Sequence, residues 1–271
     1  YMNNFYVIGN PISQSKSPLI FNYIFQKLKV GATYNAKEIY NVNDVNEFIC
    51  KCKYDSTVGC NITMPYKESL LSIIDYRDDI VKLTKSINCI KIYKNKVFGY
   101  NNDYYGFEKL ISSNQIDING SRNIVLGSGG SARTIILFLI KNNAKSISIL
   151  SRNKKTSLKI INDFKSLNKK INIDLFCEKK NYENYNLINC TPIGIIKNTE
   201  KFILSKIKSI NFNTIVDINY IYGDDFLSLT YKKIITGEDM FIFQAFKSLD
   251  IWFESNISNK LDYKIIKELI C

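Results

Sequence analysis

Short apolar runs alternate with amphipathic stretches along most of this chain. The β-type runs of its first hundred residues are 4–8, 34–39, 58–62 and 88–93. The helical patterns between them are 18–28, 42–52 and 65–74. Pro18 and Pro65 stand where first helical turns would begin, a position that tolerates the missing N–H. Strands alternating with helices predict an α/β fold built on mainly parallel sheets.

A second half with the same alternation follows a helical pattern at residues 104–112. Its expected strands are 123–126, 146–150, 171–176, 187–189 and 214–218, and its clearest helices are 131–141 and 155–167. After Gly237 the chain offers only helical patterns, at 239–254 and 261–269. Because these helices have no strands of their own, we expect them to pack on the first half. We therefore predict two domains, a discontinuous one at 1–103 with 238–271 and an inserted one at 104–237.

The composition is that of an ordinary globular protein. Of 271 residues, 45% are hydrophobic, yet no stretch reaches the roughly 18 uninterrupted apolar residues of a membrane span. The N-terminal residues lack the pattern of a secretory signal, so no membrane association and a cytoplasmic location are expected. The chain contains no histidine, which excludes His-dependent zinc sites and catalytic triads. Its 7 cysteines are irregularly spaced, so we expect neither a metal site nor a disulfide framework.

The formal net charge of +12 raises the question of nucleic-acid binding. The lysines are spread along the chain, however, which is typical of a solvated surface and favours an assignment without nucleic acid. A positive field also suits an enzyme with anionic ligands, because it raises their encounter rate. A basic nucleic-acid-binding protein stays as an alternative, and it would bind DNA or RNA in a salt-sensitive way.

A glycine-rich turn lies between the expected strand 123–126 and the expected helix 131–141. Gly127, Gly129 and Ala132 fit the dinucleotide fingerprint G-x-G-x-x-G/A, in which glycines allow a tight turn and a close approach to pyrophosphate. The start of the following helix offers free N–H groups to phosphate. A glycine turn without a ligand is the alternative. The loop residues expected at the cofactor are Gly127, Ser128, Gly129, Gly130, Ser131 and Ala132.

A basic turn follows the next strand, about 20 residues beyond the glycines, where NAD-using enzymes usually have an acidic residue. Here the turn holds Ser151, Arg152, Lys154 and Lys155. A carboxylate would repel the 2′-phosphate of NADP, whereas Arg152 can bind it through charge-assisted hydrogen bonds. The sequence therefore favours NADP(H) as cofactor, with an exposed basic turn as the alternative interpretation.

Several further motifs occur in a fixed order along the chain. They are Gly9-Asn10-Pro11, Ser15-Lys16-Ser17-Pro18 with Asn22, Asn61-Ile62-Thr63-Met64-Pro65-Tyr66-Lys67, Ile87-Asn88-Cys89, Asn101-Asn102-Asp103, Asn189-Cys190-Thr191-Pro192-Ile193-Gly194, Asp217 with Tyr220, and Gly237 with Met240 and Gln244. With these motifs the chain resembles the shikimate dehydrogenase family from Tyr6 to about Phe253. The resemblance implies an α/β substrate domain and a Rossmann-like NADP-binding domain, separated by a cleft.

The resemblance also implies an activity, the reversible NADP-dependent reduction of 3-dehydroshikimate to shikimate in aromatic amino acid and chorismate biosynthesis. It implies Lys67 and Asp103 as the catalytic pair. An ammonium can stabilise the ketone oxygen and supply its proton, and the carboxylate can orient the ammonium, but the sequence leaves open which of the two residues transfers the proton. The substrate residues that it implies are Ser15, Ser17, Thr63, Asn88, Tyr220 and Gln244, and it adds Thr191 and Gly237 to the cofactor site.

The chain departs from the family's pattern at five positions. The family usually has His at the position of Phe21, Thr at Cys89 and Asn102, Met at Ile195 and Pro at Tyr222. A quinate/shikimate dehydrogenase with relaxed substrate or NAD use remains an alternative, as does a non-catalytic NADP-binding relative. The two serines and the basic turn favour the branch that uses shikimate and NADP. The expected protein is a monomer or a homodimer.

Overall fold

The computed structural model describes residues 2–193, 200–220 and 224–270. Ile195 and Tyr222 therefore lie outside the described residues, as does Gly194. The chain divides into two compact units. The first unit comprises Tyr1–Gly106 and Phe241–Cys271, and the second unit comprises Phe107–Met240.

The first unit is built on a mixed six-stranded sheet in the order β2-β1-β3-β5-β6-β4. The strands are β1 (Asn3–Gly9), β2 (Ala32–Glu38), β3 (Thr57–Ile62), β4 (Tyr76–Arg77), β5 (Cys89–Tyr93) and β6 (Lys96–Tyr100). β1 pairs in parallel with both neighbours, whereas β5 runs antiparallel to β3 and β6. A tight β5–β6 hairpin explains why these two strands are antiparallel, since a two-residue turn cannot join parallel strands.

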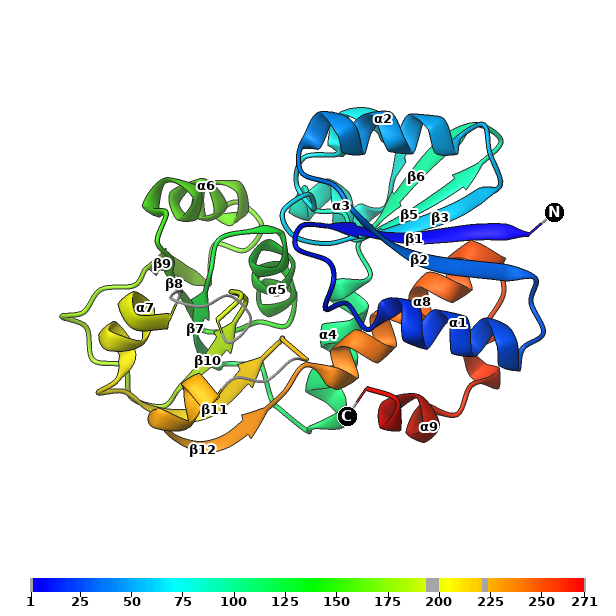
Figure 1. Cartoon of the computed structure of the whole chain (residues 1–271). Coiled ribbons are helices and arrows are strands. Elements are labelled where there is room, and N and C mark those ends of the chain that lie inside the picture. The colour runs from blue at the N-terminus through cyan, green and yellow to red at the C-terminus, as the bar shows by residue number, and fades with distance from the viewer. Residues whose placement is uncertain (1, 194–199, 221–223, 271) are drawn as a thin grey trace. The chain divides into compact units, whose positions relative to one another are not determined.

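Helices cover both faces of this sheet. They are α1 (Ser17–Lys27), α2 (Val42–Cys52), α3 (Asp79–Thr84), α8 (Glu238–Phe253) and α9 (Tyr263–Glu268). Figure 1 shows α2 on one face of the sheet and α1 and α8 on the other. Val45, Ile49 and Cys52 of α2 are fully buried in one core cluster with Ile8 of β1. The polar positions of α2 face outward, as the amphipathic pattern predicts.

The helix expected at residues 65–74 is absent, so this prediction was wrong. The segment forms turns, with Tyr66 N donating to Thr63 O at 3.0 Å, and ends in a single 3-10 turn at Leu71–Ile73. The carbonyl of Lys67 accepts from Ile87 N at 2.7 Å. Tertiary contacts of this kind replace the helical i→i+4 bonds, and they override a local preference for helix.

The second unit contains a fully parallel six-stranded sheet in the order β12-β11-β10-β7-β8-β9. Its strands are β7 (Arg122–Leu126), β8 (Ser146–Leu150), β9 (Asn172–Leu175), β10 (Tyr185–Asn189), β11 (Asn211–Asp217) and β12 (Thr230–Ile235). Its helices include α5 (Gly130–Lys141), α6 (Lys154–Phe164) and α7 (Glu200–Ile207), and α4 (Asp103–Ser113) leads into it. The α/β fold expected from the sequence is confirmed.

The strand order of the second sheet reverses between β7 and β10, the first and fourth strands of this unit along the chain. In open parallel sheets, ligands bind at such a switch point, outside the carboxyl ends of the strands. β8 and β10 are buried along their whole length, which is typical of parallel strands with both faces covered. The carboxyl ends of β7, β8 and β10 are therefore where a bound cofactor is expected.

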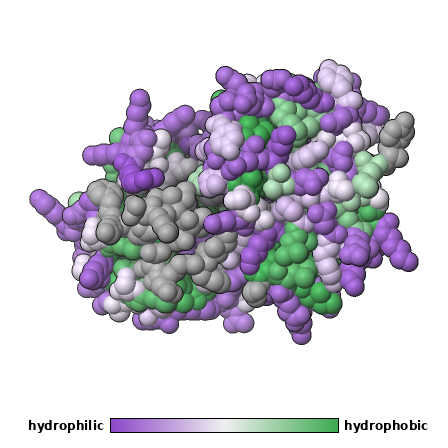
Figure 2. Space-filling model, in the orientation of Figure 1, coloured by the Kyte–Doolittle hydropathy of each residue, from purple (hydrophilic) through white to green (hydrophobic). Residues whose placement is uncertain are grey.

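The surface agrees with a composition rich in lysine. Figure 2 shows a face of the molecule dominated by hydrophilic residues, with hydrophobic ones in smaller areas. Among the residues described, no helix has both the length and the apolar character needed to cross a membrane. Over the same residues, His, Cys, Asp and Glu side chains form no group of three or more that could hold a metal ion.

Candidate active site

Lys67 and Asp103 form an ion pair in the first unit. Lys67 lies in the turns that follow β3, and Asp103 is the first residue of α4. Lys67 Nζ lies 2.6 Å from Asp103 Oδ2, and the exposed fractions of the two side chains are 17% and 8%. Taking two charges out of water is costly, so a pair this buried persists only because the partners compensate each other. The predicted catalytic pair is therefore brought into direct contact.

Two amide side chains complete this group. Asn88 Nδ2 donates to Asp103 Oδ1 at 2.7 Å and lies 3.4 Å from Gln244 Oε1. Asn88 Oδ1 accepts from the backbone N of Asn102 at 2.7 Å, which determines the orientation of the amide. All three side chains are buried. Residues from the approach to β5, the start of α4 and the middle of α8 thus meet around one carboxylate.

The remaining substrate residues expected in the first unit lie at the carboxyl ends of parallel strands. Ser15 and Ser17 follow β1, and Ser15 Oγ accepts from Ser17 N at 3.3 Å. Thr63 directly follows β3, and its methyl group would lie 2.4 Å from a Cβ placed on Gly9 at the end of β1. Lys67 follows β3 by five residues. Hydroxyls, an ammonium and amides of this kind can bind a small acid that carries several hydroxyl groups.

The glycine loop of the second unit makes a tight turn between β7 and α5. Gly127 has φ +105°, and a Cβ there would lie 3.1 Å from Cys190 O and 3.2 Å from Thr191 Cγ2. Gly129 caps α5 without a side chain, and the start of a helix is where backbone N–H groups can face an anionic ligand. Ala132 is fully buried, as expected where the helix packs closely on the sheet.

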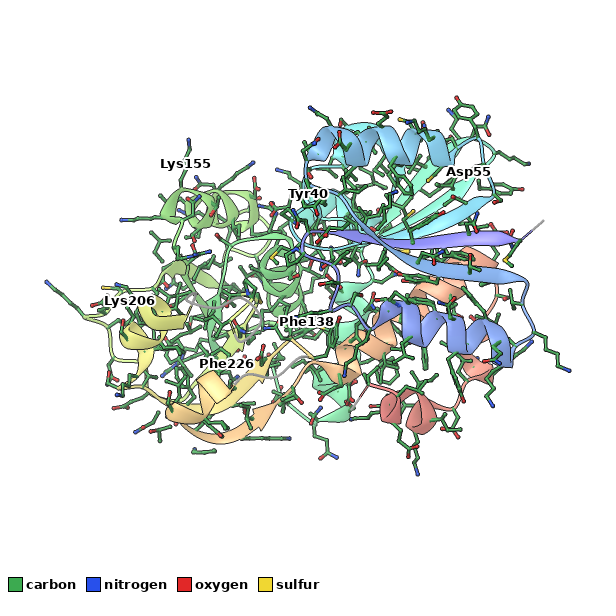
Figure 3. The ribbon with its side chains drawn as sticks, viewed as in Figure 1. Tyr40, Asp55, Phe138, Lys155, Lys206 and Phe226 are labelled. Atoms are coloured by element: carbon green, nitrogen blue, oxygen red, sulfur yellow. The ribbon has the colours of Figure 1, made fainter. Side chains whose placement is uncertain are left out.

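The basic turn lies next to this loop. Ser128 Oγ and Thr156 Oγ1 are 2.5 Å apart, which joins the residues after β7 to the start of α6. Ser151 Oγ lies 2.7 Å from Ser157 Oγ. Arg152, Lys154 and Lys155 are all exposed, and Figure 3 shows Lys155 extending outward from α6. The sequence analysis missed Thr156, although its place just after the basic turn could have suggested it.

The other predicted residues of the second unit lie at its strand ends. Thr191 follows β10, and its hydroxyl donates to Asn189 Oδ1 at 2.6 Å. Gly237 follows β12, and a Cβ there would lie 2.1 Å from Ile218 O, so the position admits no side chain. Tyr220 follows β11 and is half-buried. Its contact with substrate stays a prediction.

Cys89 and Asn102, two departures from the family's pattern, lie beside the acid–base pair. Burial raises the pKa of the Cys89 thiol to about 12, so this group is a neutral thiol at physiological pH. Its neighbours include the side chains of Ser248, Asn102 and Trp252. The sequence analysis missed Ser248 and assigned no role to Asn61, which contacts it.

Comparisons with known proteins identify the family of the chain. The family model of the shikimate dehydrogenase substrate binding domain matches residues 7–90. Shikimate dehydrogenase (NADP(+)) from Clostridium beijerinckii is 32% identical over 259 residues, covering 94% of this chain and 93% of the relative. The protein of the same name from Clostridium botulinum is 35% identical over 260 residues, covering 91% and 95%.

A solved structure of a shikimate dehydrogenase is similar to this chain over nearly its whole length. The crystal structure of shikimate dehydrogenase 1 from Peptoclostridium difficile has a TM-score of 0.81 and 26% identity, covering 99% of this chain and 97% of that chain. Identity above 30% to the two relatives extends over nearly the whole length of each chain. This chain belongs to the shikimate dehydrogenase family.

Proposed function

We propose that this protein catalyses the reversible NADP-dependent reduction of 3-dehydroshikimate to shikimate, a step towards chorismate and the aromatic amino acids. The observation that carries the proposal is the buried Lys67–Asp103 pair, with Asn88 on the second carboxylate oxygen. Relatives of similar length are named shikimate dehydrogenase (NADP(+)). A non-catalytic relative would not need to keep a charged pair of this kind buried.

The second unit fits NADP. A ligand phosphate would be held by the turn at Gly127, where a Cβ would meet Cys190 O, and by the N–H groups at the start of α5. Arg152, assisted by Lys154 or Lys155, would bind the 2′-phosphate through charge-assisted hydrogen bonds. NADPH, when bound, supplies the hydride for the reduction. The positive charge of the turn favours NADP over NAD, because it is matched to the additional phosphate.

The first unit supplies the proton chemistry. As the ketone oxygen of the substrate gains negative charge, the Lys67 ammonium stabilises that charge and donates a proton to the oxygen. In the direction of shikimate oxidation, the neutral amine accepts the proton from the hydroxyl. Asp103 holds Lys67 at 2.6 Å and pairs its positive charge in the states in which Lys67 carries the proton.

The remaining side chains of the first unit bind and orient the substrate. We assign the carboxylate of shikimate to the hydroxyls of Ser15 and Ser17, and the ring hydroxyls to Thr63, Asn88 and Gln244. A site built from such donors and acceptors rejects analogues without hydroxyls, since its buried polar groups would lose their partners. Residues 1–103 and 238–271 form the proposed substrate domain, and residues 104–237 form the proposed NADP domain.

We further propose that the protein acts in the cytoplasm, as a monomer or a homodimer. Six cysteines within the described residues are free thiols, which is typical of a reducing compartment. The proposed ligands are small molecules, and the proposal includes neither a nucleic acid nor a membrane as partner. Salt-sensitive binding to DNA or RNA without turnover would contradict it.

Formation of NADPH from shikimate and NADP by the purified protein tests the proposed function directly. We expect an increase in absorbance of NADPH that depends on both substrates, with shikimate preferred over quinate and NADP over NAD. Quinate turnover at a similar rate would assign the broader quinate/shikimate activity. Tight NADP binding without turnover of either acid would contradict the proposal and favour the non-catalytic alternative.

A further inference from the structure

A buried network of polar side chains lies behind the acid–base pair, with Ser248 of α8 at its centre. The Ser248 hydroxyl is fully buried. It accepts from Asn61 Nδ2 and from Asn102 Nδ2, each at 3.0 Å, and donates to Gln244 O at 2.9 Å. A serine hydroxyl has one proton to donate and two lone pairs to accept with. Ser248 therefore uses its whole hydrogen-bonding capacity at this junction.

The two residues that donate to Ser248, Asn61 and Asn102, both contact Asn88. Asn102, held at its side chain by Ser248, donates its backbone N–H to Asn88 Oδ1 at 2.7 Å. Asn61 Nδ2, shared with Ser248, also lies 3.2 Å from Asn88 O. Asn88 then donates Nδ2 to the carboxylate of Asp103. A reversed Asn88 amide would turn its oxygen towards that carboxylate, and the backbone N–H of Asn102 prevents this.

The far end of the network is also ordered. Tyr34, fully buried, donates its hydroxyl to Asn61 Oδ1 at 2.8 Å. The Tyr34 ring stacks on Phe21 with centroids 4.3 Å apart and an interplanar angle of 6°. Every residue from the phenol to the carboxylate therefore has its partner inside the first unit.

Three departures from the family's pattern gather around this network. Phe21 stacks on Tyr34, Asn102 donates to Ser248, and the thiol of Cys89 lies beside Ser248 and Asn102. These residues are far apart in the sequence, and they share one buried environment.

We infer that Ser248 is a positioning residue for the reaction: with Asn102 and Asn61 it orients the Asn88 amide, which in turn holds Asp103 against Lys67. The inference rests on the proposed function and extends it to residues that do not touch the substrate. A fully satisfied buried network specifies one arrangement, whereas an apolar core would leave the amide free to turn. Small displacements of a catalytic group reduce the rate of the chemical step.

Ser248→Ala tests the inference, because it removes the junction and leaves the catalytic residues in place. We expect kcat with shikimate to fall about tenfold, while the KM for NADP stays unchanged. Asn102→Ala keeps its backbone N–H and removes only the contact with Ser248, so a similar loss is expected. If Ser248 and Asn102 act through their mutual contact, kcat of the double variant should be no lower than kcat of the less active single variant.

Ser86→Ala is the matched control. Ser86 is also fully buried in the first unit, and among the residues that the structure describes its hydroxyl oxygen has no hydrogen-bond partner. Its removal should leave kcat within about twofold of the parent value, since no hydrogen bond is lost. A kcat for Ser248→Ala equal to that of Ser86→Ala would overturn the inference, as would losses that multiply in the double variant. If Ser248→Ala does not fold, Asn102→Ala decides the outcome by the same kinetic criterion.

A second measurement is independent of turnover. In ¹⁵N-labelled protein, the side-chain amide of Asn88 should change its resonance positions in Ser248→Ala and keep them in Ser86→Ala. Unchanged Asn88 resonances in Ser248→Ala would refute the positioning role. A parent protein that does not oxidise shikimate would refute the proposed function instead, and the amide resonances would still decide whether Ser248 orients Asn88.

Discussion

The two units carry their chemistry in different ways. In the first unit the candidate residues are buried side chains that hold one another, as in the series from Tyr34 through Ser248 to Asp103. In the second unit the ligand contacts expected are backbone N–H groups at the start of α5 and exposed cations after β8. The first arrangement fixes the geometry of a reaction, and the second provides charge and space for a phosphate. Changes in the first unit should therefore alter kcat, and changes in the second should alter cofactor affinity.

The largest effect is expected from Lys67→Ala. General acid–base catalysis is worth about a hundredfold to ten-thousandfold in rate, so kcat should fall by that amount. The affinity for NADP should barely change, because the substitution lies in the first unit. Steady-state kinetics with shikimate and a titration of NADPH fluorescence measure the two quantities separately.

Lys82→Ala is the control for that variant. Lys82 is an exposed lysine of the same unit that pairs with Asp79 at 2.8 Å, and surface pairs of this kind contribute little. Its loss should leave kcat unchanged. Full activity in Lys67→Ala would show that Lys67 takes no part in the reaction. It would also contradict the expectation that changes in the first unit alter kcat.

Gly127→Ala should give the next largest effect, and it acts on the cofactor. A Cβ at this position would lie 3.1 Å from Cys190 O on a backbone with φ +105°, so the loop must shift to accept it. We expect NADP affinity to fall by about tenfold or more, as when one good ligand contact is lost. Gly120 also has a positive φ, of +71°, but a Cβ there would have open space around it. Gly120→Ala should therefore bind NADP normally. Equal affinities in the two variants would contradict the phosphate role of the loop.

The contrast between the units also explains what the sequence could predict. The glycine loop was found from local pattern alone, because a strand, a tight turn and a helix follow each other within twenty residues. Lys67 and Asp103 were found only through the family resemblance, since nothing local distinguishes them from surface or capping residues. Their contact spans 36 positions of the chain.

Ser248 shows where sequence patterns give no signal. It lies in a helix dominated by apolar residues, and its partners Asn61 and Asn102 are 187 and 146 positions away. In the hydrophobic pattern of α8, this serine is only a polar residue among the buried apolar ones. The prediction of a helix at residues 65–74 failed for the same reason. Ile87 N donates to Lys67 O, and this hydrogen bond is a tertiary contact that the local sequence does not reveal. Local rules cannot anticipate partners that only the fold brings together.

An effect on cofactor affinity of similar size is expected from Arg152→Glu in the basic turn. A hydrogen bond to a charged group contributes about 1.5–3 kcal/mol, so NADP affinity should fall by roughly tenfold to a hundredfold. NAD lacks the 2′-phosphate, and its affinity should change much less. Lys165→Glu makes an equal change of charge at another exposed position of the second unit, and it should preserve the preference for NADP. A preference unchanged in Arg152→Glu would show that this arginine does not contact the 2′-phosphate.

The smallest effect is expected at the far end of the network, from Tyr34→Phe. The substitution keeps the ring that stacks on Phe21 and removes the donor to Asn61 Oδ1. Leaving a buried acceptor without this donor should lower the free energy of unfolding by about 1–3 kcal/mol. Because Asn61 keeps its contacts with Ser248 and with Asn88 O, kcat should fall only about twofold to threefold. Urea unfolding and steady-state kinetics measure the two changes.

Tyr182→Phe separates stability from positioning in this experiment. Its hydroxyl accepts from Cys177 N at 2.9 Å, and its side chain is 5% exposed, so the variant loses a comparable buried bond in the second unit. We expect a similar loss of stability with kcat unchanged. If Tyr34→Phe also left kcat unchanged, the network would end functionally at Asn61, and Ser248 would orient Asn88 without help from the phenol. A larger loss in Tyr34→Phe than in Ser248→Ala would place the organising group at Tyr34 and overturn the central role of Ser248.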